Sequence, residues 1–159
     1  MEDLYNKTNK KWKYKIYNNV LPQIDDFTEN GYTKEELKMI NETRKILGDE
    51  DLKITATTAR VPVENSHAIS ISIELDRDFD LDEIKNLLKN QEGVVLMDDI
   101  ENEIYPLPTM ATGHDEVYVG RIRRDYSLDY GINLWCVADN IRKGAVTNAV
   151  ENAEILLEV

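Results

Sequence analysis

The sequence predicts an α+β fold, with a mixed, mostly antiparallel sheet and helices packed on one face. Apolar and polar residues alternate over residues 69–75, which is the period of a half-buried strand. Two capping boxes, at residues 33–36 and 80–83, precede segments with the apolar spacing of amphipathic helices. Two apolar segments, 117–124 and 132–138, are separated by a short turn segment and predict a hairpin.

Three helices are expected. The first begins after Thr33, runs to about Leu47 and stops at Gly48, because glycine readily adopts the left-handed conformation that ends a helix. The second begins after Asp80, and its apolar side chains fall on one face. The third begins at about Asn140 and has a stripe of small residues suited to close packing.

Between these helices the sequence predicts strands and loops. Residues 13–24 are expected to be extended or irregular, residues 54–63 to form a strand, and residues 64–66 to turn into the next strand. Residues 94–97 predict a short buried strand. The expected hairpin has apolar side chains on both faces and therefore needs cover on both, one from the chain's own helices and the other from a partner subunit.

Length, charge and cysteine usage limit the possible functions. The 159 residues accommodate one domain, assigned to residues 13–159, after a polar and poorly ordered leader over residues 1–12. A net charge of −12 argues against nucleic-acid binding, which needs a basic face. No apolar run approaches the roughly 20 residues that cross a bilayer, and the start lacks a signal peptide. The single cysteine, Cys136, fits a reducing compartment, so a cytoplasmic protein without membrane partners is expected.

Arg60 and His67 are the first candidates for chemistry. A guanidinium at the end of one extended segment and an imidazole at the start of the next are expected to meet across a tight turn and face a shared pocket. Arginine binds carboxylates and phosphates through two parallel hydrogen bonds, and histidine exchanges protons readily near neutral pH. On the residues alone the signal is weak, because a histidine beside an apolar strand is more often structural.

Five stretches of the chain occur in the order and spacing of one enzyme family. They are Val20–Asp25, Glu35–Leu47, Arg60–Val63 followed by His67, Gly120–Asp125, and Leu134–Ala145. Together they resemble the C-terminal part of aspartate-semialdehyde dehydrogenase, and the resemblance covers residues from about 17 to 157.

The resemblance implies the C-terminal domain fold shared with glyceraldehyde-phosphate dehydrogenases. It also implies the NADP-dependent, phosphate-linked interconversion of aspartate semialdehyde and aspartyl phosphate, a step in lysine, threonine and methionine biosynthesis. In that chemistry a cysteine thiolate attacks the carbonyl carbon, and hydride moves to or from the nicotinamide. The N-terminal half of the family pattern, with its nucleophilic cysteine and glycine-rich nucleotide turn, is missing from this sequence. The chain is therefore expected to be inactive alone.

The family's site residues transfer by motif. His67 would be the general acid and base, Arg60 would hold the substrate carboxylate, Glu35 its ammonium group, and Lys38 the phosphate. Glu35 and Lys38 are three residues apart, so they share a helix face. Without the resemblance, Glu35 would be read as a first-turn carboxylate favoured by the helix dipole, and Lys38 as a solvated side chain.

Lys143, Gly144 and Ala145 would approach the nicotinamide end of NADP. They open the last helix, where free backbone N–H groups favour an anion. Simple capping by Asp139 or Asn140 is an equal alternative. The resemblance further implies a homodimer and no metal, and a separate nucleotide-binding half is a further candidate partner.

Two departures from the family and one alternative function remain open. The chain has Ser66-His67-Ala68 where the family usually has Gly-His-Ser, and Thr58 where it often has cysteine. The alternative to an enzyme part is a non-catalytic remnant or pseudoenzyme that acts as a dimerisation module.

Overall fold

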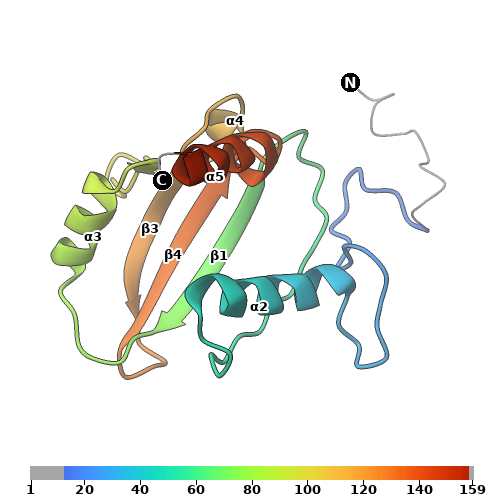
Figure 1. The fold of residues 1–159 in the computed structure, drawn as a ribbon, viewed down its shortest axis with the longest axis horizontal. Helices are drawn as coiled ribbons and strands as arrows, with labels where there is room; N and C mark the ends of the chain where they lie inside the picture. Colours follow the sequence, from blue (N-terminus) through green and yellow to red (C-terminus); the bar gives the residue numbers. More distant parts are fainter. Residues whose placement is uncertain (1–12, 158–159) are drawn as a thin grey trace. The chain divides into compact units, whose positions relative to one another are not determined.

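A computed structural model describes residues 13–157, which form two compact units divided between Pro62 and Val63 (Figure 1). The polar leader expected over residues 1–12 lies outside the described residues. Each unit is described by itself, and the assignment of residues 13–159 to one domain stays a prediction.

The first unit is built on helix α2, Lys34–Leu47. Its N-cap is Thr33, whose hydroxyl accepts a hydrogen bond from the backbone N–H of Glu36, while the Glu36 carboxylate accepts one from the N–H of Thr33. The helix ends at Gly48, which adopts φ 67° and donates its N–H to the carbonyl of Arg44. The predicted capping box and glycine stop are both confirmed.

The Glu36 side chain also binds a distant part of the first unit. It is buried, and its second oxygen accepts a hydrogen bond of 2.8 Å from the backbone N–H of Thr58. These backbone N–H groups, Thr33 first and then Thr58, lower the pKa of Glu36. One carboxylate thus joins the start of α2 to the extended segment before Arg60.

The strand predicted over residues 54–63 is wrong. Residues 54–59 are extended but belong to no ladder, and Arg60 makes a single bridge to Leu21 through backbone bonds of 2.8 and 3.0 Å. Burial alternates along the segment, which explains the strand-like sequence pattern. Because a carboxylate binds the N–H of Thr58, that buried group is satisfied without a neighbouring strand.

The second unit contains a four-stranded sheet in the order β1-β4-β3-β2. The strands are β1 His67–Glu74, β2 Val94–Leu96, β3 Val117–Asp125 and β4 Gly131–Ala138. The β3–β4 hairpin and the β1–β4 pair are antiparallel, whereas β2 pairs with β3 in parallel. The predicted mixed, mostly antiparallel sheet is confirmed.

The core of the second unit lies between the sheet and helix α3, Leu81–Asn90 (Figure 1). The Asp80 carboxylate caps this helix by accepting hydrogen bonds from the N–H groups of Asp82 and Glu83. Three strand residues are buried there, and apolar side chains of α3 and the neighbouring strands pack around them. The buried three are Val119, Ile122 and Ile132.

Edge strand β1 is less covered than its alternating sequence predicts. Its register with β4 sets Ile69 and Ile73 opposite Cys136 and Ile132, on the face that α3 covers elsewhere. Both isoleucines nevertheless remain about two-fifths exposed, at 40% and 38%. The main strand contacts of helix α3 are with β2 and β3, toward the opposite edge of the sheet.

The opposite face of the hairpin is covered partly by the chain itself. Trp135 donates its indole N–H to the carbonyl of Pro106 at 3.2 Å, and Pro106 is fully buried. This loop leads into the short helix α4, Pro108–Ala111, which contacts β4. The sequence predicted that a partner subunit covers this face, but this loop covers part of it. Ser70 and Ser72 on the same face stay exposed.

The chain continues from β4 into a π-helical turn, η1 Arg142–Val146, and then into α5, Thr147–Leu157. In Figure 1, α5 appears by the end of β4, to which η1 connects it. The last helix thus starts close to the predicted Asn140, with a wider first turn. Across residues 13–157, no helix combines the length and apolarity that crossing a membrane requires.

Replacing Glu36 with glutamine tests the link in the first unit. Because folding lowers the Glu36 pKa from its usual 4.5, the carboxylate stabilises the fold above that pH, and this contribution is lost as the pH falls. Glu36→Gln should lower the melting temperature at pH 7 by about 5 °C or more and flatten its decline between about pH 5 and 3. Thermal unfolding followed by circular dichroism measures both. Glu42→Gln, on the exposed side of α2, is the control, and equal behaviour of the two variants would contradict the link.

Replacing Gly120 with alanine tests the packing between β3 and the segment after β2. An added Cβ would lie 2.0 Å from the Met97 carbonyl oxygen and 2.7 Å from Pro106 Cδ, so backbone must move. The expected loss in free energy of unfolding is about 3 kcal/mol or more, measured by urea denaturation. Gly144→Ala is the matched control, because its Cβ would meet nothing nearer than 3.6 Å. A Gly120→Ala protein as stable as this control would refute the close approach.

Candidate active site

The predicted substrate-binding residues Glu35 and Lys38 lie near the start of α2. Their side chains form an ion pair, with Lys38 Nζ 3.8 Å from Glu35 Oε2. The prediction that they share a helix face is confirmed. Lys38 is exposed and Glu35 half-buried, so an ammonium and a carboxylate lie side by side at the surface of the first unit.

Arg60 also belongs to the first unit, where its backbone is fixed to Leu21 by two hydrogen bonds and its side chain is half-buried. His67 belongs to the second unit. The two residues do not sit on paired strands, because β1 pairs with β4 and residues 54–63 form no strand. The expected strand-turn-strand connection is therefore wrong, and the shared pocket stays a prediction.

His67 is the first residue of β1 and is paired with Ala138 at the end of β4. Its imidazole is exposed. The preceding residue, Ser66, has φ 75°, in the left-handed region that favours glycine. A glycine, which the resemblance implies at the position of Ser66, would adopt this conformation without strain.

Three contacts hold Ser66 in this unfavourable conformation. Its backbone N–H donates to Asn140 Oδ1 at 2.9 Å. Its hydroxyl lies 3.2 Å from the carbonyl oxygen of Pro108 and 3.0 Å from Thr112 Oγ1. The residue before His67 is thus fixed to the end of β4 and to α4.

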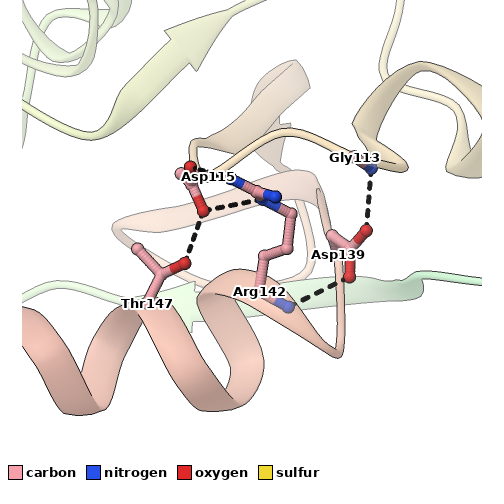
Figure 2. A network of polar contacts seen from close by, with 5 residues as sticks. All are labelled: Gly113, Asp115, Asp139, Arg142 and Thr147. Atoms are coloured by element: carbon pink, nitrogen blue, oxygen red, sulfur yellow. Dashed lines mark hydrogen bonds and ion pairs between the residues drawn. The ribbon is translucent and has the colours of Figure 1, made fainter.

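Asp139 is the most enclosed polar group near His67, with only 2% of the residue exposed. One carboxylate oxygen accepts hydrogen bonds from the backbone N–H of Gly113, at 2.8 Å, and from Asn65 Nδ2, at 3.1 Å. The other accepts from the N–H groups of Ile141, at 2.8 Å, and Arg142, at 3.1 Å. Figure 2 shows the bonds of Asp139 with Gly113 and Arg142. The N–H of Gly113 and then those of Ile141 and Arg142 lower the Asp139 pKa against the opposing effect of burial.

A second carboxylate, Asp115, fixes the first turns after β4. The Arg142 guanidinium donates two hydrogen bonds to it, at 2.9 and 2.5 Å, and the Thr147 hydroxyl donates another (Figure 2). The hydrogen bonds from Arg142 have the largest effect and the one from Thr147 the next, and they lower the pKa of Asp115 to about 2. Arg142 is therefore engaged within the chain.

The predicted cofactor residues follow directly along η1. Lys143 forms an ion pair of 2.5 Å with Glu151, whereas Gly144 and Ala145 are exposed. The anion site expected from free N–H groups is not formed at the first positions, because the Asp139 carboxylate accepts from both Ile141 and Arg142. Asp139 thus caps these first N–H groups, and the cofactor contact of Lys143, Gly144 and Ala145 stays a prediction.

The sequence did not reveal that Asp139 and Asn140 hold the turn before His67. Their positions after a strand and before a helix indicated only a cap. Nothing in the sequence signals their bonds to Asn65 and Ser66, which lie 74 residues away. Cys136 packs against the core of the second unit, where burial raises its pKa to about 11.

The chain is similar to proteins of one known family. The family described as semialdehyde dehydrogenase, dimerisation domain, matches residues 1–143. The aspartate-semialdehyde dehydrogenase of Aquifex aeolicus is 48% identical over 99% of this chain and 50% of its own length. That of Bacillus subtilis is 50% identical over 92% of this chain and 42% of its own.

Solved structures agree with the sequence matches. The crystal structure of aspartate semialdehyde dehydrogenase II from Vibrio cholerae matches with a TM-score of 0.88 and 43% identity, covering 92% of this chain and 43% of that one. A second structure of the same protein, complexed with ASA, matches equally well. The chain spans about half the length of the curated relatives that it matches. It belongs to the semialdehyde dehydrogenase dimerisation-domain family.

Proposed function

We propose that this chain is the C-terminal, substrate-binding and dimerisation part of an aspartate-semialdehyde dehydrogenase, inactive without a nucleotide-binding half. The identity of 48% to the Aquifex enzyme over 99% of the chain supports this most directly. The apolar side chains exposed on α5, such as Ile155 and Leu156, fit a chain that spans half the length of its relatives.

The proposed substrate is aspartate semialdehyde, with phosphate as co-substrate. A relative 43% identical to this chain was solved in complex with ASA. In the proposed roles, the Arg60 guanidinium binds the substrate carboxylate, Glu35 its ammonium group, and Lys38 the phosphate. Glu35 and Lys38 lie together at the surface with opposite charges, which matches the opposite charges of the ammonium group and the phosphate assigned to them.

His67 is the proposed general acid and base. Its exposed imidazole is available to a ligand, and the residue before it is held by three contacts. A base that transfers a proton needs such accessibility together with a fixed position. The nucleophilic sulfur would come from the other half, since Cys136 lies in a strand and its raised pKa disfavours the thiolate.

NADP is the proposed cofactor of the complete enzyme, where it would supply or accept hydride. Gly144 and Ala145 fit contact with it, because their backbone is exposed and an added Cβ on Gly144 would meet nothing nearer than 3.6 Å. Lys143 would have to leave Glu151 to reach an anionic group.

We also propose a homodimer, which the description of the matching family as a dimerisation domain supports. The alternative function is a non-catalytic dimerisation module. The presence of Glu35, Lys38, Arg60 and His67 together favours the enzyme part over this alternative.

Reconstitution tests the proposed activity. The pure chain should show no reduction of NADP with aspartate semialdehyde and phosphate, and co-expression with the nucleotide-binding half of a complete relative should restore it. In the reconstituted pair, His67→Ala should reduce kcat by about 10²- to 10⁴-fold, because proton transfer loses its base. His114→Ala, an exposed histidine beside Tyr118, is the control and should leave activity unchanged. Turnover by the chain alone would contradict its proposed inactivity, and an inactive wild-type pair would contradict the function.

Arg60→Lys separates charge from geometry at the proposed carboxylate site. Lysine keeps the positive charge but cannot form two parallel hydrogen bonds. The KM for aspartate semialdehyde should rise by about tenfold, the value of one lost charge-assisted hydrogen bond, while the KM for phosphate stays unchanged. Steady-state kinetics of the reconstituted pair measure both constants. A rise in the KM for phosphate alone would show that Arg60 binds the phosphate and not the substrate carboxylate.

A further inference from the structure

We propose that Asp139 and Asn140 are positioning residues that fix His67 for proton transfer by clamping the turn before it to the end of β4. The proposal rests on the proposed function of His67. In this proposal neither side chain binds substrate or cofactor, and both act through the residues that they hold in place.

The clamp has two arms that meet the same turn. Asp139 binds the side chain of Asn65 at 3.1 Å, and Asn140 binds the backbone N–H of Ser66 at 2.9 Å. His67 follows immediately and pairs with Ala138, the residue before Asp139. Hydrogen bonds therefore join the residues that precede His67 to the residues that follow Ala138. This leaves the His67 backbone little freedom to rotate.

Backbone strain makes the clamp necessary in this chain. A serine with φ 75° is less favourable than a glycine there, so the turn would relax without partners. The Ser66 hydroxyl near Pro108 and Thr112 adds a third point of attachment. The hydrogen bonds of Ser66 thus hold a conformation that the residue does not prefer.

The same carboxylate sets the start of η1. One oxygen of Asp139 binds Asn65, and the other accepts hydrogen bonds from Ile141 and Arg142. Asp139 therefore joins the segment of the proposed base to the segment that is proposed to contact the cofactor. A displacement of about 1 Å can cost a hundredfold in rate, so a rigid connection between these two segments matters for catalysis.

The first experiment uses the 159-residue chain alone. Asn140→Ala removes the acceptor for the Ser66 N–H, and Asn140→Asp keeps it. In Asn140→Ala, amide exchange at Ser66 measured by NMR should accelerate about tenfold, and the His67 ring resonances should shift while those of His114 do not. Asn140→Asp should restore the wild-type pattern. Asn148→Ala, an exposed asparagine on α5, is the matched control. Unchanged exchange and unchanged His67 resonances in Asn140→Ala would overturn the clamp.

The second experiment measures the consequence in the reconstituted pair. Asn140→Ala should lower kcat by about tenfold to a hundredfold with KM for aspartate semialdehyde within about twofold, and Asn140→Asp should recover most of the rate. Equal losses of kcat in Asn148→Ala, or no recovery in Asn140→Asp, would overturn the positioning role. An inactive wild-type pair would instead overturn the assignment of His67 as a base, a result that the exchange measurements distinguish from failure of the clamp.

Discussion

The buried carboxylate of Asp139 is the constraint on which the candidate site in the second unit depends. Four N–H groups from three separate segments converge on its two oxygens. A buried carboxylate is costly unless it is hydrogen-bonded on all sides, and here the cost is offset by backbone donors that would otherwise be unpaired. The turn before His67, the loop at Gly113 and the start of η1 therefore form or separate together.

Glu36 is the corresponding buried carboxylate of the first unit, and N–H groups bind it in the same way. Both carboxylates cap a helix and also accept a hydrogen bond from backbone far away in the sequence, Thr58 for Glu36 and Gly113 for Asp139. In the first unit the start of a helix is thereby fixed to the segment that bears Arg60. In the second unit it is the bond from the Asn65 side chain that joins Asp139 to the segment bearing His67. A chain with 31 acidic residues and a net charge of −12 thus uses some of its carboxylates as structural acceptors rather than as surface charges.

Much of the fold could be predicted because its signals are local. The capping box at Thr33, the stop at Gly48 and the helix after Asp80 depend on residues within one turn of each other. The β3–β4 hairpin likewise joins adjacent segments. The strand prediction for residues 54–63 was wrong because an alternating pattern indicates an extended backbone but does not indicate which group binds its N–H groups. For Thr58 that partner is a side chain.

The sequence by itself determined the family, through motifs in order, and the identity of the candidate residues, since Glu35, Lys38, Arg60 and His67 are matched by type and spacing. It also determined that Glu35 and Lys38 share a face, because helix geometry fixes residues three apart. Only the tertiary structure decided how His67 is held. Ser66 and Asn140 are 74 residues apart, and their contact exists because β1 pairs with β4 in one particular register. A register is a property of the folded sheet, so no local pattern contains it.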